Sequence, residues 1–452
     1  MITKQFPRTF WVANALELLE RWAWYGFFIL FANYLTGSSD AGGLEFTQTQ
    51  KGILMGVGTG ILYFLPVLTG AIADRYGYKR VLLVAFIAYA SAFLLLPLFT
   101  TFTAVFLMYL YLAIGAALFK PVISATIAKT TTAQTASIGF GIYYLMVNIG
   151  AFFGPIVTLL FKADYSIVFH ISAGVILLNL LLLIIYKEPG RLSRPVAVPL
   201  RRATGEIFSN MFSIVRDTRF LLFLLIVAGF WTMYNQLFFT LPVFISQWVD
   251  TAPLYHFFTL HLPFISANYS PSPGIIDAEF VTNFDALYII LLQVIVSTLI
   301  MRVRPLRSMI TGFLVCSIGM SLTLFSQNVL FTLVAILVFA VGEMAGSPKI
   351  TEYIGSIAPA DKKALYMGYS FIPVFLGNLF AGLISGFVYQ SMSDKVTMVK
   401  DYALQQGFSI PADLSQQQFF DAVALQAGLS PRELTNLLWQ LYSPSSIWIV
   451  VL

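Results

Sequence analysis

Long apolar stretches alternate with short polar segments along almost the whole chain. Each complete stretch is roughly 20 to 28 residues long, the length of a helix that spans a bilayer and about twice that of a strand in a membrane barrel. The pattern therefore predicts an all-α membrane protein and excludes an outer-membrane barrel. The complete stretches lie at residues 9–35, 48–73, 80–100, 103–128, 136–162, 166–186, 220–248, 281–302, 306–326, 329–353 and 364–391.

A further apolar stretch begins at Ser446 and reaches Leu452 after only a few residues. Because about 20 apolar residues are needed to cross a bilayer, we expect the natural chain to continue past Leu452, or this helix to be disordered or removed. Counting this stretch, the pattern predicts twelve transmembrane helices, the twelfth of them truncated.

The composition agrees with a polytopic membrane protein. Hydrophobic residues make up 58% of the 452 residues and charged residues only 10%, whereas a soluble domain carries about 25% charged residues. The single cysteine, Cys316, excludes a disulfide framework. The apolar stretches hold no nucleophile–base or metal-ligand constellation, so we expect neither an enzyme nor a metal or organic cofactor.

The basic residues predict the orientation in the membrane. Most of the 26 lysines and arginines fall in the polar segments that face the cytoplasm if the N-terminus does, as the positive-inside rule requires. We therefore expect a multi-pass protein of the cell membrane, inner or plasma, with a cytoplasmic N-terminus. The net charge of +5 then reports orientation and does not indicate binding to nucleic acid.

A long, basic, proline-bearing segment separates the sixth apolar stretch from the seventh. Two groups of six helices joined by such a linker resemble the organisation of the major facilitator superfamily. We expect a monomer with an N-terminal six-helix bundle at 1–190, a cytoplasmic linker at 191–219 and a C-terminal six-helix bundle at 220–452.

Two polar segments on the predicted outer side are unusually long. Residues 249–280 are proline-rich, and residues 392–445 show helical periodicity. The second segment is typical of a soluble helical cap that packs on its own apolar face. The alternative is a surface for substrate capture or for a partner protein.

Four charged residues lie within the apolar stretches of the first half. Glu17, Glu20 and Arg21 share one face of a helix, and Lys120 lies in the fourth stretch. Each charge would cost about 2.5–3.5 kcal/mol if it faced lipid at mid-bilayer, so all four should face the interior and neutralise one another. The alternative is a purely structural salt-bridge network, although buried ion pairs stabilise a fold poorly.

The loop at residues 70–80 resembles the signature loop of the major facilitator superfamily. It places Asp74, Arg75 and Gly77 between the second and third stretches. Gly77 would permit a tight turn between two helices. The resemblance assigns these residues to a cytoplasmic gate.

The residues from Glu17 to Gly26 resemble the ExxERFxxYG motif of the proton-dependent oligopeptide transporter family, with Trp22 in place of phenylalanine. Further segments of both halves are similar to motifs of that family in the same order. These are Tyr63-Phe-Leu-Pro66, Gly115 to Pro121, Tyr143 to Gly150, Phe230 to Gln236, Gly342 to Pro348 with Ala358-Pro359, and Met367-Gly368 with Gly377-Asn378.

The resemblance implies a major facilitator fold and a symporter that imports di- and tripeptides with protons by alternating access. Its substrate is a small molecule and its coupling ion is the proton. A zwitterionic peptide needs a cation for its carboxylate and an anion for its ammonium group. By analogy Arg21 and Lys120 would bind the carboxylate, Glu343 and Asn148 the amino end, while Tyr25, Tyr63 and Trp231 would line the cavity and Glu17 and Glu20 would take part in proton coupling.

Aromatic pockets for peptide side chains are a weaker prediction. Trp231, Trp24 and Phe371 are candidates, but an aromatic residue in a membrane helix more often serves packing.

The sequence departs from the family at two positions that concern proton coupling. Asn235 stands where many members carry an acid, and Asp285 stands where they carry asparagine. An amide cannot titrate, so we predict that the proton site of the second half has moved to Asp285. The alternative is that Asp285 lies in the N-cap region of its helix at the outer mouth.

Two other functions remain open at this stage. One is symport or export of another small organic solute or drug, because the substrate pocket departs from the family. The other is a nutrient sensor that binds its ligand and transports little, with residues 392–445 as the surface for a partner.

Overall fold

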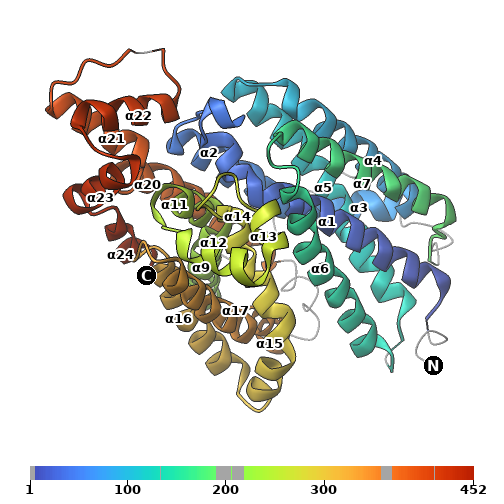
Figure 1. Cartoon of the computed structure of the whole chain (residues 1–452). Helices are drawn as coiled ribbons and strands as arrows, with labels where there is room; N and C mark the ends of the chain where they lie inside the picture. Colours follow the sequence, from blue (N-terminus) through green and yellow to red (C-terminus); the bar gives the residue numbers. More distant parts are fainter. Residues whose placement is uncertain (1–5, 133, 190–204, 206–217, 358–368, 412) are drawn as a thin grey trace.

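The computed structural model describes residues 6–132, 134–189, 205, 218–357, 369–411 and 413–452, and these residues form helices joined by short loops (Figure 1). Most of the predicted linker at 191–219, and the motif residues 358–359 and 367–368, lie outside the described residues. In the N-terminal half the helices are α1 (Arg8–Thr36), α2 (Gln48–Phe64), α3 (Pro66–Tyr76), α4 (Tyr78–Leu95), α5 (Phe102–Thr130), α6 (Ala136–Leu159) and α7 (Tyr165–Ile185).

The C-terminal half contains several short helices beside its long ones. The long helices are α9 (Thr218–Tyr234), α15 (Phe284–Ile300), α16 (Pro305–Thr323), α17 (Val329–Ile357) and α19 (Phe371–Leu383). The short ones are α10 (Gln236–Phe239), α11 (Leu241–Trp248), α12 (Ala252–His261), α13 (Pro263–Asn268), α14 (Ala278–Thr282), α20 (Tyr389–Met392), α21 (Lys395–Gln405), α22 (Gln416–Ala427), α23 (Pro431–Tyr442) and α24 (Trp448–Val451).

The described helices confirm an all-α membrane protein. Nine of them are long and apolar enough to cross a membrane, or ten if the bent pair α2–α3 counts as one span. Helix α1 is not among these helices because its charged and polar residues lower its mean hydropathy. Its 29 residues are nevertheless enough to span a membrane. Together with α1, these helices correspond to the eleven complete stretches of the sequence.

Several of the predicted spans are broken rather than continuous. Between α2 and α3 the axis bends by 42° at Pro66, whose ring cannot donate a backbone hydrogen bond. The seventh span breaks at Asn235 and again at Thr240, and the eighth breaks at Asn283. Each break lies in the membrane-spanning part of the chain, where irregular backbone occurs only if it is buried in protein or lines a cavity.

The helices form two bundles, one from each half of the chain (Figure 1). In the first bundle α1 packs against α6 and α7, and in the second α17 packs against α15 and α16. The bundles meet where α2 crosses α19. There Gly52 and Gly56 face Gly382 so closely that a Cβ added to Gly52 would lie 2.2 Å from the Gly382 carbonyl oxygen.

Polar contacts tie the bundles together at the end where α1 terminates, which the basic residues predict to be the outer end. Lys162, between α6 and α7, pairs with Asp277 at 2.9 Å and with Glu279 at 2.6 Å. Glu279 also accepts a hydrogen bond from Asn33 at the end of α1, at 2.7 Å. At the opposite end, where the N-terminus lies, the two bundles splay apart (Figure 1).

Helices α21, α22 and α23 form a compact cap at the outer end, which confirms the helical cap predicted at 392–445 (Figure 1). Ser415 and Ser430 close capping boxes at the starts of α22 and α23. The apolar faces of the helices, including Val423 and Leu434, are fully buried. The cap therefore has the small apolar core that the helical periodicity of its sequence predicts.

The cap also contacts the N-terminal half, which the sequence did not predict. Ser415 bonds to Asp40, and the backbone N–H of Gln416 donates to Glu45 at 3.0 Å. Partial burial acts to raise the pKa of Glu45, but hydrogen bonds from the backbone of Ser39 and Gln416 outweigh it and lower that pKa below its ordinary value. The cap thus bridges the two halves at their outer end.

Candidate functional site

The charged residues of α1 form a buried cluster at the interface with α6. The Arg21 guanidinium donates to both oxygens of Glu20, at 2.5 and 2.7 Å, and lies 3.3 Å from Glu17. The three residues are at most 4% exposed. The predicted placement of these charges in the interior is therefore confirmed.

Two glycines of α6 set the position of Arg21. A Cβ added to Gly150 would lie 2.8 Å from the Arg21 Cβ, and one added to Gly154 would lie 2.3 Å from the Trp22 carbonyl oxygen. The absence of side chains at these positions lets α6 press directly on α1. Tyr143 lies two helical turns before Gly150 on α6. It is close enough to Glu17 to interact with it.

Lys120 does not join the ion pairs of α1. Among the described residues no carboxylate lies within 4.0 Å of its ammonium group, which instead sits 4.2 Å from the centroid of the Tyr63 ring. Lys120 therefore makes no direct ion pair with Glu17 or Glu20, but it acts electrostatically on Glu17, so mutual neutralisation of the four charges stays a prediction. Arg21 is fully engaged by two glutamates, and Lys120 is a half-buried cation held against an aromatic face.

On the opposite side, the C-terminal half presents two acids. Asp285 at the start of α15 is 6% exposed, and it interacts electrostatically with Glu343 in the middle of α17. Glu343 also interacts with Tyr234, the last residue of α9. Sequence reasoning missed Tyr234, because a single tyrosine in an apolar helix carries no signal that separates a site residue from a packing one.

Three carboxylates of the two halves have an oxygen without a hydrogen-bond partner among the described residues. They are Glu17 Oε2, Asp285 Oδ1 and Glu343 Oε2. Burying an unsatisfied polar atom costs free energy, and native proteins rarely tolerate it without a reason. These oxygens therefore mark positions where a proton, a water or a polar ligand is expected.

Asp285 lies in the first turn of α15, two residues after its N-cap residue, so its position also fits the alternative that it belongs to the N-cap region. Asn283 is the N-cap residue of α15, and neither residue accepts a capping hydrogen bond through its side chain. Helices α14 and α15 together form one span that begins at Ala278. Asp285 thus lies within the membrane-spanning segment, just past a helix break. Asn235 marks the corresponding break on the seventh span, where its amide donates to the Trp231 carbonyl at 2.7 Å.

Aromatic side chains line the space between the charged groups of the two halves. The Tyr25 ring lies 5.9 Å from the Arg21 guanidinium carbon and 6.0 Å from the ring of Phe238 in the other half. Tyr25 also lies within electrostatic range of Tyr63 and of Glu343. The structure therefore brings Tyr25 and Tyr63 together with the charged candidates, as predicted.

The other aromatic candidates differ from one another. Trp231 is half-buried beside Tyr234, with ring centroids 5.1 Å apart, and remains close to the site. Trp24 is only 3% exposed and stacks on Phe28, so its assignment to a substrate pocket is wrong. Phe371 is 36% exposed at the first turn of α19.

Asn148 faces outward from α6 beside Tyr144. Its amide nitrogen donates to the Tyr144 carbonyl oxygen at 2.8 Å. Tyr144 lies within electrostatic range of Glu343 and Asp285. This part of α6 therefore faces the acids of the C-terminal half.

The predicted gate loop is a tight turn at the inner end of the N-terminal half. Gly77 adopts a φ of +94°, which favours glycine, and the Tyr78 backbone N–H donates to Glu188 at 3.0 Å. The Tyr78 hydroxyl donates to Asp74 at 3.0 Å and accepts from Lys129 at 2.8 Å. Arg75 is exposed. The turn is confirmed, while a role of Asp74, Arg75 and Gly77 in gating stays a prediction.

The site as a whole is dipolar. Its N-terminal wall carries Lys120, which has no carboxylate within 4.0 Å among the described residues, and Arg21 paired with Glu17 and Glu20. Its C-terminal wall carries Glu343 and Asp285. Aromatic rings lie between the two walls. Such an arrangement suits a small solute with a negative group at one end and a positive group at the other.

Comparison with curated proteins identifies relatives with different substrates in their names. The multidrug resistance protein MdtH of Photorhabdus laumondii is 22% identical over 81% of this chain and 84% of its own length. The dipeptide and tripeptide permease A of Cronobacter turicensis is 27% identical over 51% of this chain and 45% of its own length.

Solved structures share the fold over nearly the whole chain. The nucleoside transporter NupG aligns with a TM-score of 0.68 at 14% identity, covering 98% of each chain. Peptide transporters of the POT family, one of them in complex with sulfate and one with 5-aminolevulinic acid, align at 0.61 and 0.60. They are 15% and 17% identical, and the alignments cover 98% and 97% of this chain and 94% and 97% of theirs.

The relatives and the fold agree with the motifs. The peptide permease and the POT structures confirm the resemblance to oligopeptide transporters, within a wider likeness to drug and nucleoside transporters. The relatives are transporters and not enzymes. The model of the Major Facilitator Superfamily matches residues 11–249, more than half of the chain, so the protein belongs to the major facilitator superfamily.

Proposed function

We propose that this protein is a proton-coupled symporter that imports di- and tripeptides across the cell membrane. The observation that carries the proposal is a pair of groups, one from each half, that lack partners among the described residues. Lys120 has no carboxylate within 4.0 Å, and Glu343 Oε2 has no hydrogen bond. A zwitterionic peptide supplies the missing partner of each, its carboxylate near Lys120 and its ammonium group near Glu343.

The way the bundles meet supports alternating access. The contacts of Lys162 and Asn33 with Glu279 close the outer end, while the inner ends of the bundles splay apart. Opening to the outside requires these outer contacts to break. A proton and a peptide bound between the bundles would shift the balance between the two states through the groups that they neutralise.

The runner-up is transport of another small organic solute or drug. The likeness to MdtH supports this alternative, because MdtH aligns over 81% of the chain and the peptide permease over 51%. The dipolar site favours a zwitterion over a nucleoside or an apolar drug.

Uptake of labelled dialanine into proteoliposomes tests the proposal. With an inwardly directed pH gradient, we expect accumulation that collapses when a protonophore removes the gradient. Binding without accumulation would favour a nutrient sensor. Absence of both, together with uptake of another solute, would favour the runner-up.

The role of Glu343 leads to a prediction about substrate selectivity. If Glu343 receives the ammonium group, N-acetylated dipeptides should compete with dialanine at least about tenfold more weakly, because one charge-assisted hydrogen bond is worth roughly 1.5–3 kcal/mol. The variant Glu343→Gln should bind free and acetylated dipeptides about equally. Glu352→Gln, an exposed acid two turns further along α17, serves as the control. Equal competition by both forms in the parent protein would show that Glu343 has another role.

A further inference from the structure

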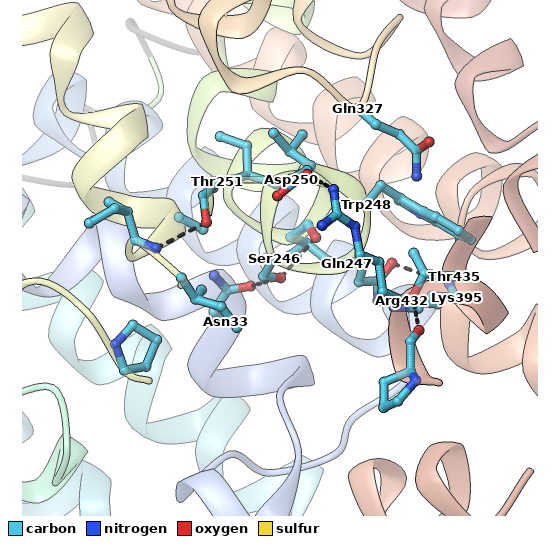
Figure 2. Close-up of a pocket in the computed structure, with 18 of the residues that line it drawn as sticks. Asn33, Ser246, Gln247, Trp248, Asp250, Thr251, Gln327, Lys395, Arg432 and Thr435 are labelled. Atoms are coloured by element: carbon cyan, nitrogen blue, oxygen red, sulfur yellow. Dashed lines mark hydrogen bonds and ion pairs between the residues drawn. The ribbon is translucent and has the colours of Figure 1, made fainter. Parts of the chain in front are cut away.

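A cavity lies at the outer end of the bundles, beneath the cap. It has a volume of about 1130 Å³, and α11, the end of α1 and the cap helices α21–α23 all contribute to its walls (Figure 2). A typical site for a small organic ligand measures roughly 300–1,000 Å³, so the space is sufficient. The contacts of Asn33 with Glu279 and Pro242 separate this cavity from the central site.

The charged residues of this outer cavity are paired, with one exception. Lys162 pairs with Asp277 at 2.9 Å. Arg432 pairs with Asp250 at 2.6 Å (Figure 2). Lys395 has no carboxylate within 4.0 Å among the described residues, and Asp421 acts on it only from a greater distance. Its ammonium group donates to the Thr435 hydroxyl at 2.7 Å.

Aromatic rings surround Lys395. The ammonium group lies 4.3 Å from the centroid of Phe420 and 5.7 Å from that of Trp248. The ring of Trp439 lies 5.8 Å from that of Trp248 and adds to the same wall. The cavity thus offers one cation without an anion, a hydroxyl beside it and an apolar aromatic surface around both.

We propose that the outer cavity is a second binding site, for solutes that carry a carboxylate next to an apolar group, with Lys395 as the residue that binds the carboxylate. Phe420, Trp248 and Trp439 hold the apolar group, and the Thr435 hydroxyl, which accepts from Lys395 and donates to the Pro431 carbonyl oxygen, holds the ammonium group in place. This inference rests on the proposed function only for the identity of the natural ligand, which is a short peptide on its way to the central site. Three separate parts of the fold build the site, and two of them, the cap and α11, belong to one half.

Protection of an introduced thiol tests the site directly. Asn436 lines the cavity and is exposed, while the native Cys316 is fully buried. In Asn436→Cys, we expect a membrane-impermeant maleimide added outside intact cells to react with the new thiol. The dipeptide alanyl-phenylalanine should slow that reaction at least threefold, and its C-terminal amide, which lacks the negative charge, should not. Leu425 lies on the surface of the cap and is 82% exposed, so the thiol of Leu425→Cys should be protected by neither compound.

A second pair of variants assigns the charge to Lys395. On the Asn436→Cys background, Lys395→Met keeps an unbranched apolar stem against the rings and removes the cation, so the protection should disappear. Lys400→Met, on the same helix but outside the cavity lining, should leave it unchanged. If alanyl-phenylalanine and its C-terminal amide protect the thiol of Asn436→Cys equally, the proposal is wrong. This comparison does not depend on Lys395→Met, so it holds even if that variant loosens the cap.

Two further arms separate the outer site from the central one. N-acetylated alanyl-phenylalanine keeps its carboxylate but lacks the ammonium group expected at Glu343, so it should protect as well as the free dipeptide. Protection should also survive Arg21→Ala. If both arms give protection while the parent protein takes up no dialanine, the proposed function fails and the outer site stands. Loss of protection in both arms would show that the effect arises from the central site and would overturn the inference.

Discussion

Arg21→Ala should abolish peptide uptake while the protein remains folded in the membrane. Arg21 makes two hydrogen bonds to Glu20 and an ion pair with Glu17 at the contact of α1 with α6. Truncating one partner of a buried charge pair costs about 2–5 kcal/mol, which corresponds to at least about a 30-fold loss of transport rate. Initial rates of dialanine uptake, normalised to the amount of protein in the membrane, measure the effect.

Loss of folding is the competing explanation, and a second variant addresses it. Without Arg21, Glu17 and Glu20 would be two buried acids with no partner, which destabilises the fold. The double variant Arg21→Ala/Glu20→Gln removes one of these charges and should recover expression and thermal stability but not uptake. Near-normal uptake in either variant would show that Arg21 does not serve the substrate.

The charged face of α1 could be predicted from the sequence because it depends only on helical spacing. Residues three and four positions apart share a face, and the cost of placing charges in lipid fixes that face as the inner one. The buried cluster of Glu17, Glu20 and Arg21 follows from these two facts alone. The turn at Gly77 was predictable for a similar reason, because the left-handed backbone there favours glycine.

Other features depend on packing between distant parts of the chain and could not be predicted. The basic-residue count placed Lys162 in an outer loop, but its partners Asp277 and Glu279 lie more than a hundred residues away. The contacts of the cap with Asp40 and Glu45 span an even larger separation. Lys120 shows the same limit, since the balance of charges does not predict that its ammonium group lies against the ring of Tyr63.

The helix breaks lie between these two cases. Pro66 predicts the bend between α2 and α3, because proline has no backbone N–H to donate to the helix. Asn235 and Asn283 give no comparable signal, although each begins a new helix inside a predicted span. Both breaks lie beside residues of the candidate site, Tyr234 and Asp285. Departures from regular helix geometry in the membrane are therefore the structural sign of the site that the sequence did not show.

Asp285→Asn should abolish proton-driven accumulation of peptide while exchange of peptide across the membrane survives. Asp285 is buried, interacts with Glu343 and has a carboxylate oxygen without a partner among the described residues. Asn235, at the family's usual acidic position, is an amide that donates to the backbone of its own helix and cannot carry a proton. In the variant the position at 285 stays polar and of the same size, so binding of peptide should persist.

Two assays on the same proteoliposomes separate coupling from binding. Accumulation of dialanine under an imposed pH gradient should fall to the level reached without a gradient, because no proton can bind at position 285. Counterflow, in which an internal excess of unlabelled dialanine drives entry of the labelled form, should remain within about tenfold of the parent rate, since a substitution of equal size usually costs less than about 1.5 kcal/mol. Asp285→Glu keeps a titratable group and should retain accumulation. If accumulation in Asp285→Asn still follows the pH gradient, the proton site is not at Asp285, and Glu17, one of whose oxygens also lacks a hydrogen-bond partner among the described residues, becomes the group that couples proton to peptide.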